Sequence, residues 1–132
     1  MKQVITLGLA SAALAMLLTS AAPQSDQVMT REDGMYVVNT TTLGKDVTGY
    51  IAETPVKVYI KKNKVVKVEM LKNQETPKYN ARVKKAILTK WDNLKVKEAV
   101  SQKVDGVTGA TFTSDAVIKN VLLALEYYQK HK

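Results

Sequence analysis

Apolar and charged residues alternate in two neighbouring stretches near the middle of the chain, at positions 56–61 and 66–71. A period of two places the apolar side chains on one face of a strand, so we predict two strands that each bury one face. The side chains expected in the core are Val56, Val58, Ile60, Val66, Val68 and Met70. The turn between the strands should lie near Asn63, because asparagine tolerates the left-handed backbone that a tight hairpin often needs.

A shorter run of β-branched and aromatic residues at positions 35–40 predicts a strand ahead of this hairpin. Gly44 and Asp46 interrupt it, and extended structure is expected to resume at positions 49–51. Positions 22–34 are mostly polar, and we predict a flexible tether there.

Apolar residues at every fourth position predict a first helix after the hairpin. They are Tyr79, Val83, Ile87 and Trp91. Thr76 is the expected N-cap, and Pro77 suits the first helical position. This helix should pack on the sheet, and a short extended piece should follow at positions 94–97.

A second helix is expected to begin near Ser114 and to run to the C-terminal end, because its apolar stripe is broad. The stripe consists of Val117, Val121, Leu125 and Tyr128. Together the elements predict an α+β fold in which a small antiparallel sheet packs against two helices. Residues 35–132 should form this single domain.

The first 21 residues have the parts of a secretory signal peptide: basic Lys2, an uncharged run from Val4, and a small-residue end before Pro23. We expect cleavage after Ala21 and a location on the periplasmic or other extracytoplasmic side of the membrane. The alternative is an uncleaved membrane anchor, because the apolar run has close to the length that spans a bilayer.

Composition narrows the possible chemistry. The chain has no cysteine, which excludes a lipid-anchored lipoprotein, disulfides and thiolate metal sites, and its one histidine, His131, cannot assemble a metal site or a triad. The net charge is +8, or +7 once Lys2 is removed with the signal. The lysines alternate with apolar residues instead of forming basic runs, so we expect a solvated surface and no nucleic-acid partner. A weak, salt-sensitive contact with an anionic membrane surface or an acidic redox partner is compatible with this charge.

The most informative stretch is Asp105-Gly106-Val107-Thr108-Gly109-Ala110-Thr111. It precedes the second predicted helix, so it should be an exposed loop. The small Gly109 and Ala110 allow the backbone to enter a narrow active site, and the hydroxyl of Thr111 follows them. Such a loop resembles the substrate of a modifying enzyme more than a catalyst.

This motif, with the following Thr113 and Ser114 and an upstream Glu75-Thr76-Pro77 block, resembles the flavinylation motif of the FMN-binding domain family over roughly residues 49–128. That family includes the flavin-carrying subunits of bacterial respiratory ion-pumping complexes and small exported flavoproteins. The resemblance implies that Thr111 receives FMN through its phosphate from a flavin transferase that uses FAD. It also implies that Asp105, Thr108, Gly109 and Ala110 serve recognition by that transferase.

Further expectations concern the bound group. The remaining phosphodiester charge could be received by backbone N–H groups and the hydroxyls of Thr113 and Ser114, with Asp115 competing for the same helix end. The resemblance makes Glu75 and Thr76 candidates for the polar edge of the flavin. Their alternative roles are a carboxylate near a helix dipole and a simple helix cap. The candidate ring contacts are Phe112, Tyr50, Tyr59 and Tyr79, and ordinary core packing is the alternative for each of them.

Self-modification is not expected, because a threonine hydroxyl needs a base or a metal for activation and the nearest carboxylate of the motif, Asp105, lies six residues away. A transferase with bound Mg²⁺ can supply both. We therefore expect an electron carrier with covalent FMN, with no catalytic or metal-binding residues of its own, and with a redox protein or membrane oxidoreductase as partner. The alternative is a small exported binding or inhibitory module in which the motif is only a turn.

Overall fold

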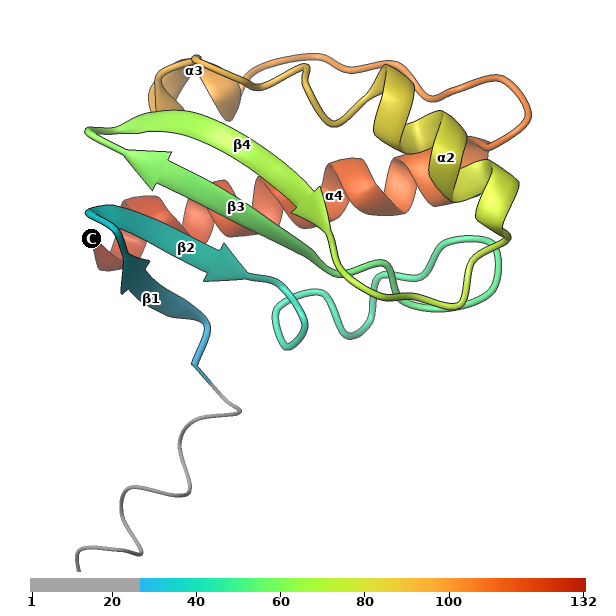
Figure 1. Ribbon diagram of the computed structural model, residues 1–132, viewed down its shortest axis with the longest axis horizontal. Coiled ribbons are helices and arrows are strands. Elements are labelled where there is room, and N and C mark those ends of the chain that lie inside the picture. Colours follow the sequence, from blue (N-terminus) through green and yellow to red (C-terminus); the bar gives the residue numbers. More distant parts are fainter. Residues whose placement is uncertain (1–26) are drawn as a thin grey trace, which may run out of the picture.

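The computed structural model describes residues 27–132, so the predicted signal peptide and the first part of the tether lie outside the described residues. Four strands form one antiparallel sheet in chain order (Figure 1). They are β1 (Met29–Glu32), β2 (Met35–Asn39), β3 (Val56–Lys61) and β4 (Lys64–Met70). With the helices described below, this confirms the predicted α+β fold.

Strand β1 lies within the stretch assigned to the flexible tether, so that assignment is wrong for Met29–Glu32. The hairpin between β1 and β2 turns at Asp33 and Gly34, which have φ angles of 50° and 80°. Positive φ at both central residues is the conformation that an Asp-Gly pair favours in a two-residue hairpin. The dipeptide was therefore a usable signal, although the strand before it is short.

The β3–β4 hairpin confirms the predicted turn but not the predicted burial of Val66. Its central residues, Lys62 and Asn63, have φ angles of 52° and 62°. A bulge then shifts the pairing, because Tyr59 opposes Lys67 while Ile60 opposes Val65. As a result Val65 is buried and Val66, which was expected in the core, is 39% exposed. One extra residue in a strand moves the following side chain to the other face.

Within the described residues, three helices complete the fold: α2 (Pro77–Ala86), α3 (Val96–Ala99) and α4 (Thr111–His131). Val83, Ile87 and Trp91 are buried as predicted, but α2 ends at Ala86 and turns carry the rest of the stripe. Helix α2 lies beyond the end of the sheet and packs against α4 instead of the sheet (Figure 1).

Helix α3 replaces only the second half of the extended piece expected at positions 94–97, because Lys95 is extended and forms a β-bridge with Lys64. Its first turn is closed by Glu98, whose Oε1 accepts the backbone N–H of Lys95 at 3.2 Å. A glutamate three residues after the N-cap stabilises a helix start in this way. Within residues 27–132, no helix combines the length and apolarity needed to cross a bilayer.

Helix α4 crosses one face of the sheet and extends beyond its end to contact α2 (Figure 1). Its predicted stripe is buried: Val117, Val121, Leu125 and Tyr128. On the same helix Asn120 is fully buried, and its Nδ2 donates to the backbone oxygens of Thr54 at 3.1 Å and Ala116 at 3.0 Å. This side chain ties α4 to the long β2–β3 connection, where Gly44 leaves room for it.

Candidate functional site

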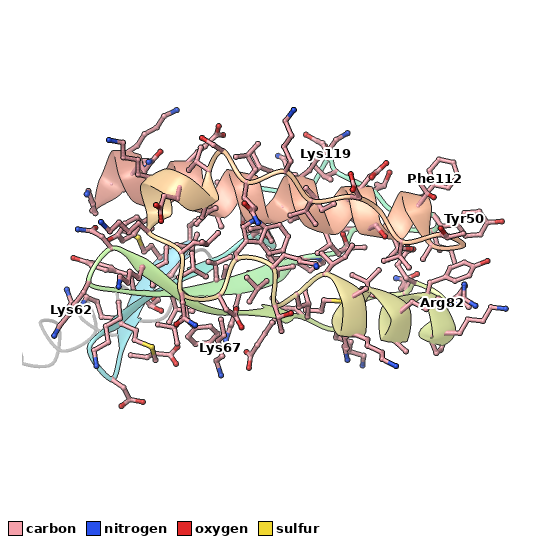
Figure 2. All side chains as sticks on the ribbon, turned by 90° about the horizontal axis from the view of Figure 1, so that it is seen from above. Tyr50, Lys62, Lys67, Arg82, Phe112 and Lys119 are labelled. Carbon is pink, nitrogen blue, oxygen red and sulfur yellow. The ribbon has the colours of Figure 1, made fainter. Side chains whose placement is uncertain are left out.

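Three segments that are distant in the sequence meet at one end of the molecule: the β2–β3 connection near Tyr50, the first turn of α2, and the start of α4. They enclose a shallow pocket of about 240 Å³. The pocket is lined by Tyr50, Tyr79, Gly109, Ala110, Thr111, Phe112 and Thr113. Figure 2 shows Tyr50 and Phe112 side by side at this end, with Arg82 close to them.

Thr111 lies on the rim of this pocket and is exposed. It is the first residue of α4, so the helix begins three residues earlier than predicted and Thr111 belongs to the helix instead of the loop. Ala110 before it is 3% exposed and its N–H donates to the oxygen of Val107 at 2.9 Å. The backbone beneath Thr111 is therefore anchored while its side chain remains accessible.

The recognition residues predicted upstream of Thr111 form an exposed turn. Asp105, Thr108 and Gly109 are all exposed. Gly109 has a φ of 85°, which glycine adopts without strain. The guanidinium of Arg82 crosses this turn, and its Nη1 donates to the oxygen of Thr108 at 3.3 Å. No sequence pattern linked Arg82 to this turn, because Arg82 is a polar position between the apolar Tyr79 and Val83 of the predicted helix.

Ser114 holds the turn against α4 and has no free hydroxyl proton. Its Oγ donates to the oxygen of Ala110 at 2.7 Å and accepts the N–H of Val107 at 3.0 Å. The residue is fully buried. The expectation that this hydroxyl receives a phosphodiester is therefore wrong for the geometry observed, and its role is to fix the conformation of the loop before Thr111.

Glu75 is the most heavily hydrogen-bonded side chain near the pocket. Its carboxylate accepts the backbone N–H groups of Tyr50 at 2.6 Å, Ile51 at 2.6 Å and Ala52 at 3.1 Å. The hydroxyl of Thr113 donates to the same carboxylate at 2.7 Å. Successive N–H groups that converge in this way form an anion-binding concavity, which an internal carboxylate fills here.

This arrangement corrects three sequence-based expectations. Residues 50–52 form bends around the carboxylate, whereas extended structure was expected at positions 49–51. Thr113 is fully buried and its hydroxyl donates a hydrogen bond to Glu75, so this hydroxyl is not available to a phosphodiester. Glu75 itself is 4% exposed and faces the protein's own backbone, so its role is to hold the loop that carries Tyr50. Thr76 occupies the N-cap position of α2 without a side-chain cap hydrogen bond in the described structure.

The ionised form of Glu75 is favoured by these contacts. Burial alone would raise the pKa of the carboxyl, but the hydrogen bonds from Thr113 and from the three backbone N–H groups outweigh it. The pKa therefore lies below its ordinary value of 4.5. Gly49 is required beside it, because a Cβ there would lie 2.2 Å from Oε1 of Glu75.

Three of the four predicted aromatic contacts surround the pocket. The ring of Tyr50 lies 6.2 Å from that of Phe112 and 6.1 Å from that of Tyr79. Tyr50 is 62% exposed and Phe112 is 65% exposed, so their faces are open to a planar group. The fourth, Tyr59, is buried on the sheet, where burial and the Glu69 carboxylate raise its pKa to about 12. Tyr59 is therefore not a ring contact, and the alternative, core packing, is confirmed for it.

The charge around Thr111 suits an anion. In the described structure the first turn of α4 contains no acidic residue and no side chain caps it. Asp115 lies beyond that turn because the helix starts early, so the predicted competition from its carboxylate is not observed. Free N–H groups and the helix dipole attract negative charge. Within residues 27–132, no three His, Cys, Asp or Glu side chains gather as a metal site would require.

A comparison with protein-family models matches residues 49–126 to the FMN-binding domain. The match covers more than half of the chain and includes both the Glu75 block and the motif that ends at Thr111. Searches among characterised proteins and among solved structures gave no significant match.

Proposed function

Since the chain belongs to the FMN-binding domain family and is a flavoprotein, we propose that it is an exported electron carrier with FMN joined through its phosphate to Thr111. One observation supports this proposal above the others. Thr111 is an exposed hydroxyl at the rim of an aromatic-lined pocket, at a helix N-terminus. These are the three features that attachment, ring contact and phosphate accommodation require.

Attachment is a phosphoryl-group transfer from FAD. The Thr111 oxygen attacks the phosphorus that carries the riboflavin group, a new oxygen–phosphorus bond forms, and the bond to the bridging oxygen breaks. AMP leaves, and the hydroxyl proton passes to a base of the transferase. A transferase-bound Mg²⁺ offsets the charge that develops at phosphorus. Neither Glu75 nor Ser114 replaces that base, because both side chains are committed to other contacts.

The phosphodiester product keeps one negative charge. On Thr111 it lies at the unfilled start of α4, where the backbone N–H groups of the first turn can receive it. The guanidinium of Arg82, held at the neighbouring Thr108 oxygen, adds positive charge to the same region. These backbone groups and Arg82 take the role that sequence reasoning gave to the hydroxyls of Thr113 and Ser114.

The pocket dimensions and lining fit a flavin ring lying beside its attachment point. Tyr50, Tyr79 and Phe112 offer aromatic surface, and aromatic groups attract each other in stacked or tilted arrangements. Bound FMN would supply the redox chemistry, and Tyr50, Tyr79 and Phe112 are the residues of this chain that would hold its ring. Because the pocket has no pair of carboxylates or histidines for acid-base work, electron transfer fits the site better than turnover of an organic substrate.

The test is the intact mass of the protein after co-expression with a flavin transferase in the periplasm. We expect a mass gain equal to FMN less one water and a yellow colour that survives denaturation. Thr111→Val should abolish the gain without loss of stability beyond a few tenths of a kcal/mol, because the side chain is exposed. Thr89→Val, which removes an exposed hydroxyl outside the site, is the matched control and should retain the adduct.

Label retained by the Thr111→Val protein would place the attachment elsewhere. Thr108 would then be the next residue to substitute, because its hydroxyl is also exposed whereas that of Thr113 is buried. A colourless protein of unchanged mass in every variant would favour the cofactor-free binding module instead.

A further inference from the structure

At the end of the molecule opposite Thr111, lysine side chains surround a hollow of about 360 Å³. Its lining consists of Lys62, Lys64, Lys95, Lys97 and Lys132, together with Asn63, Val96 and Gln129. They come from the β3–β4 turn, the start of α3 and the end of α4. Figure 2 places Lys62 at one end of the molecule and Tyr50 and Phe112 at the other.

The frame that carries these lysines is tightly connected. The N–H of Val96 donates to the oxygen of Asn63 at 2.8 Å, which joins α3 to the hairpin turn. Asn63 Oδ1 accepts the hydroxyl of Tyr128 at 2.6 Å and Nζ of Lys132 at 3.4 Å, which joins α4 to the same turn. The positive charges are therefore held near one another by the fold.

None of the five ammonium groups has a carboxylate within ion-pair distance among the described residues, where the one such pair is Lys67 with Glu69. Glu98 lies on α3, but its Oε1 accepts the N–H of Lys95 and it does not line the hollow. Like charges that face one hollow repel each other, so an external anion would relieve this repulsion. A structural role alone does not explain the arrangement.

We propose that this hollow docks the protein on a membrane by binding the phosphate groups of anionic phospholipids. Five lysines from three segments can meet several phosphates at once, as a lipid surface offers. Each lysine that approaches an anionic lipid surface adds a similar amount of electrostatic binding free energy. Insertion into the bilayer is not part of the contact, because Tyr50, Ile51 and Phe112, the most exposed apolar side chains described, lie at the opposite end.

The distance between the two ends argues against a redox protein as the occupant. Thr111 begins α4 and Lys132 follows its end, and 21 helical residues span roughly 30 Å. Electron transfer between proteins requires close approach of their redox groups, which docking at the hollow would prevent. Docking there on a lipid surface instead leaves the Thr111 end turned towards the aqueous phase.

The experiment is co-sedimentation of the full chain with vesicles of phosphatidylcholine alone and of phosphatidylcholine mixed equally with phosphatidylglycerol. We expect added affinity for the anionic vesicles, and this gain should fall as sodium chloride is raised. Lys64→Gln with Lys97→Gln should reduce the gain roughly thirtyfold. The matched control, Lys84→Gln with Lys85→Gln on α2, removes the same charge outside the hollow and should reduce it much less.

Three results would overturn the proposal. One is equal binding of the wild-type chain to both kinds of vesicle. Another is an equal loss in the two double variants, which would assign the effect to net charge alone. The third is a loss of vesicle binding in inorganic phosphate at a low ionic strength at which sodium chloride leaves binding unchanged. That result would assign the hollow to a free phosphate compound.

Discussion

At the scale of single residues, the Glu75 carboxylate determines how the pocket is built. It receives four donors from two segments, the bend at Tyr50 to Ala52 and the first turn of α4. Hydrogen bonds to an ionised group are stronger than neutral ones, and a buried charge without them is costly. The aromatic wall at Tyr50 therefore depends on a residue that does not line the pocket itself.

Glu75→Gln should destabilise the protein by about 2–4 kcal/mol at neutral pH. The new amide nitrogen would face backbone N–H groups and cannot accept a hydrogen bond from them. The folded pKa of Glu75 is lowered, so its stabilising contribution is complete above 4.5 and is lost as the pH falls through the folded value. The stability difference between wild type and variant should thus shrink in acid. Urea unfolding across this pH range measures it.

Glu53→Gln is the control for that series, because Glu53 is an exposed glutamate in the same connection. It should change stability by less than about 0.5 kcal/mol. A Glu75→Gln protein as stable as the control at neutral pH would show that the carboxylate charge does not hold the loop.

At the scale of elements, the turn before α4 presents Thr111 through a backbone conformation that few residues adopt. Gly109 has a positive φ, and Ser114 and Arg82 fasten the turn on either side of it. Non-glycine residues in this conformation carry a strain of roughly 1 kcal/mol or more. The motif therefore selects glycine for its backbone as well as for its small size.

Gly109→Ala should lower stability by about 1 kcal/mol and slow adduct formation by the transferase, because the turn must rearrange. The new Cβ would also lie 2.3 Å from Nη1 of Arg82. That contact is with the flexible end of an exposed side chain, so it should add little. The double variant Gly109→Ala with Arg82→Ala should consequently keep most of the stability loss of Gly109→Ala, as measured by urea unfolding. Full recovery of stability in this double variant would assign the cost to the collision instead.

The sequence predicted the elements whose pattern is long and regular. The buried stripes of α4 and of the segment around Val83 follow from repeated spacing, and repeated spacing survives small errors in element ends. Prediction from repeated spacing failed at β1, which is too short to show a period. It also failed at Val66, because a bulge turns that side chain away from the core. The Glu75 contacts could not be predicted, because their backbone partners are 23 to 25 residues away in the chain and carry no side-chain signal.

At the scale of the whole molecule, one buried amide connects α4 with the connection that leads to the pocket. Asn120 Nδ2 is fixed by Thr54 and Ala116, while its Oδ1 is buried and has no hydrogen-bond partner among the described residues. A Cβ on Gly44 would lie 1.8 Å from this Oδ1. Close packing at this point sets how the connection approaches the helix.

Gly44→Ala should therefore destabilise the protein by about 1–3 kcal/mol through overpacking. Asn120→Ala removes the obstacle, so the two substitutions together should cost less than the sum of the separate costs, by about 1 kcal/mol or more. A double-mutant cycle in urea measures this coupling. Strictly additive costs would show that Gly44 and Asn120 do not constrain each other.

Helix α4 runs without interruption from Thr111 to His131, and Lys132 follows it. A tag joined beyond Lys132 is therefore about a helix length from Thr111. Molecules captured by such a tag on an electrode would carry the Thr111 end, where we propose that the flavin is attached, on the side away from the surface. The fold thereby prescribes a uniformly oriented film for voltammetry, with soluble reaction partners free to reach the outer layer.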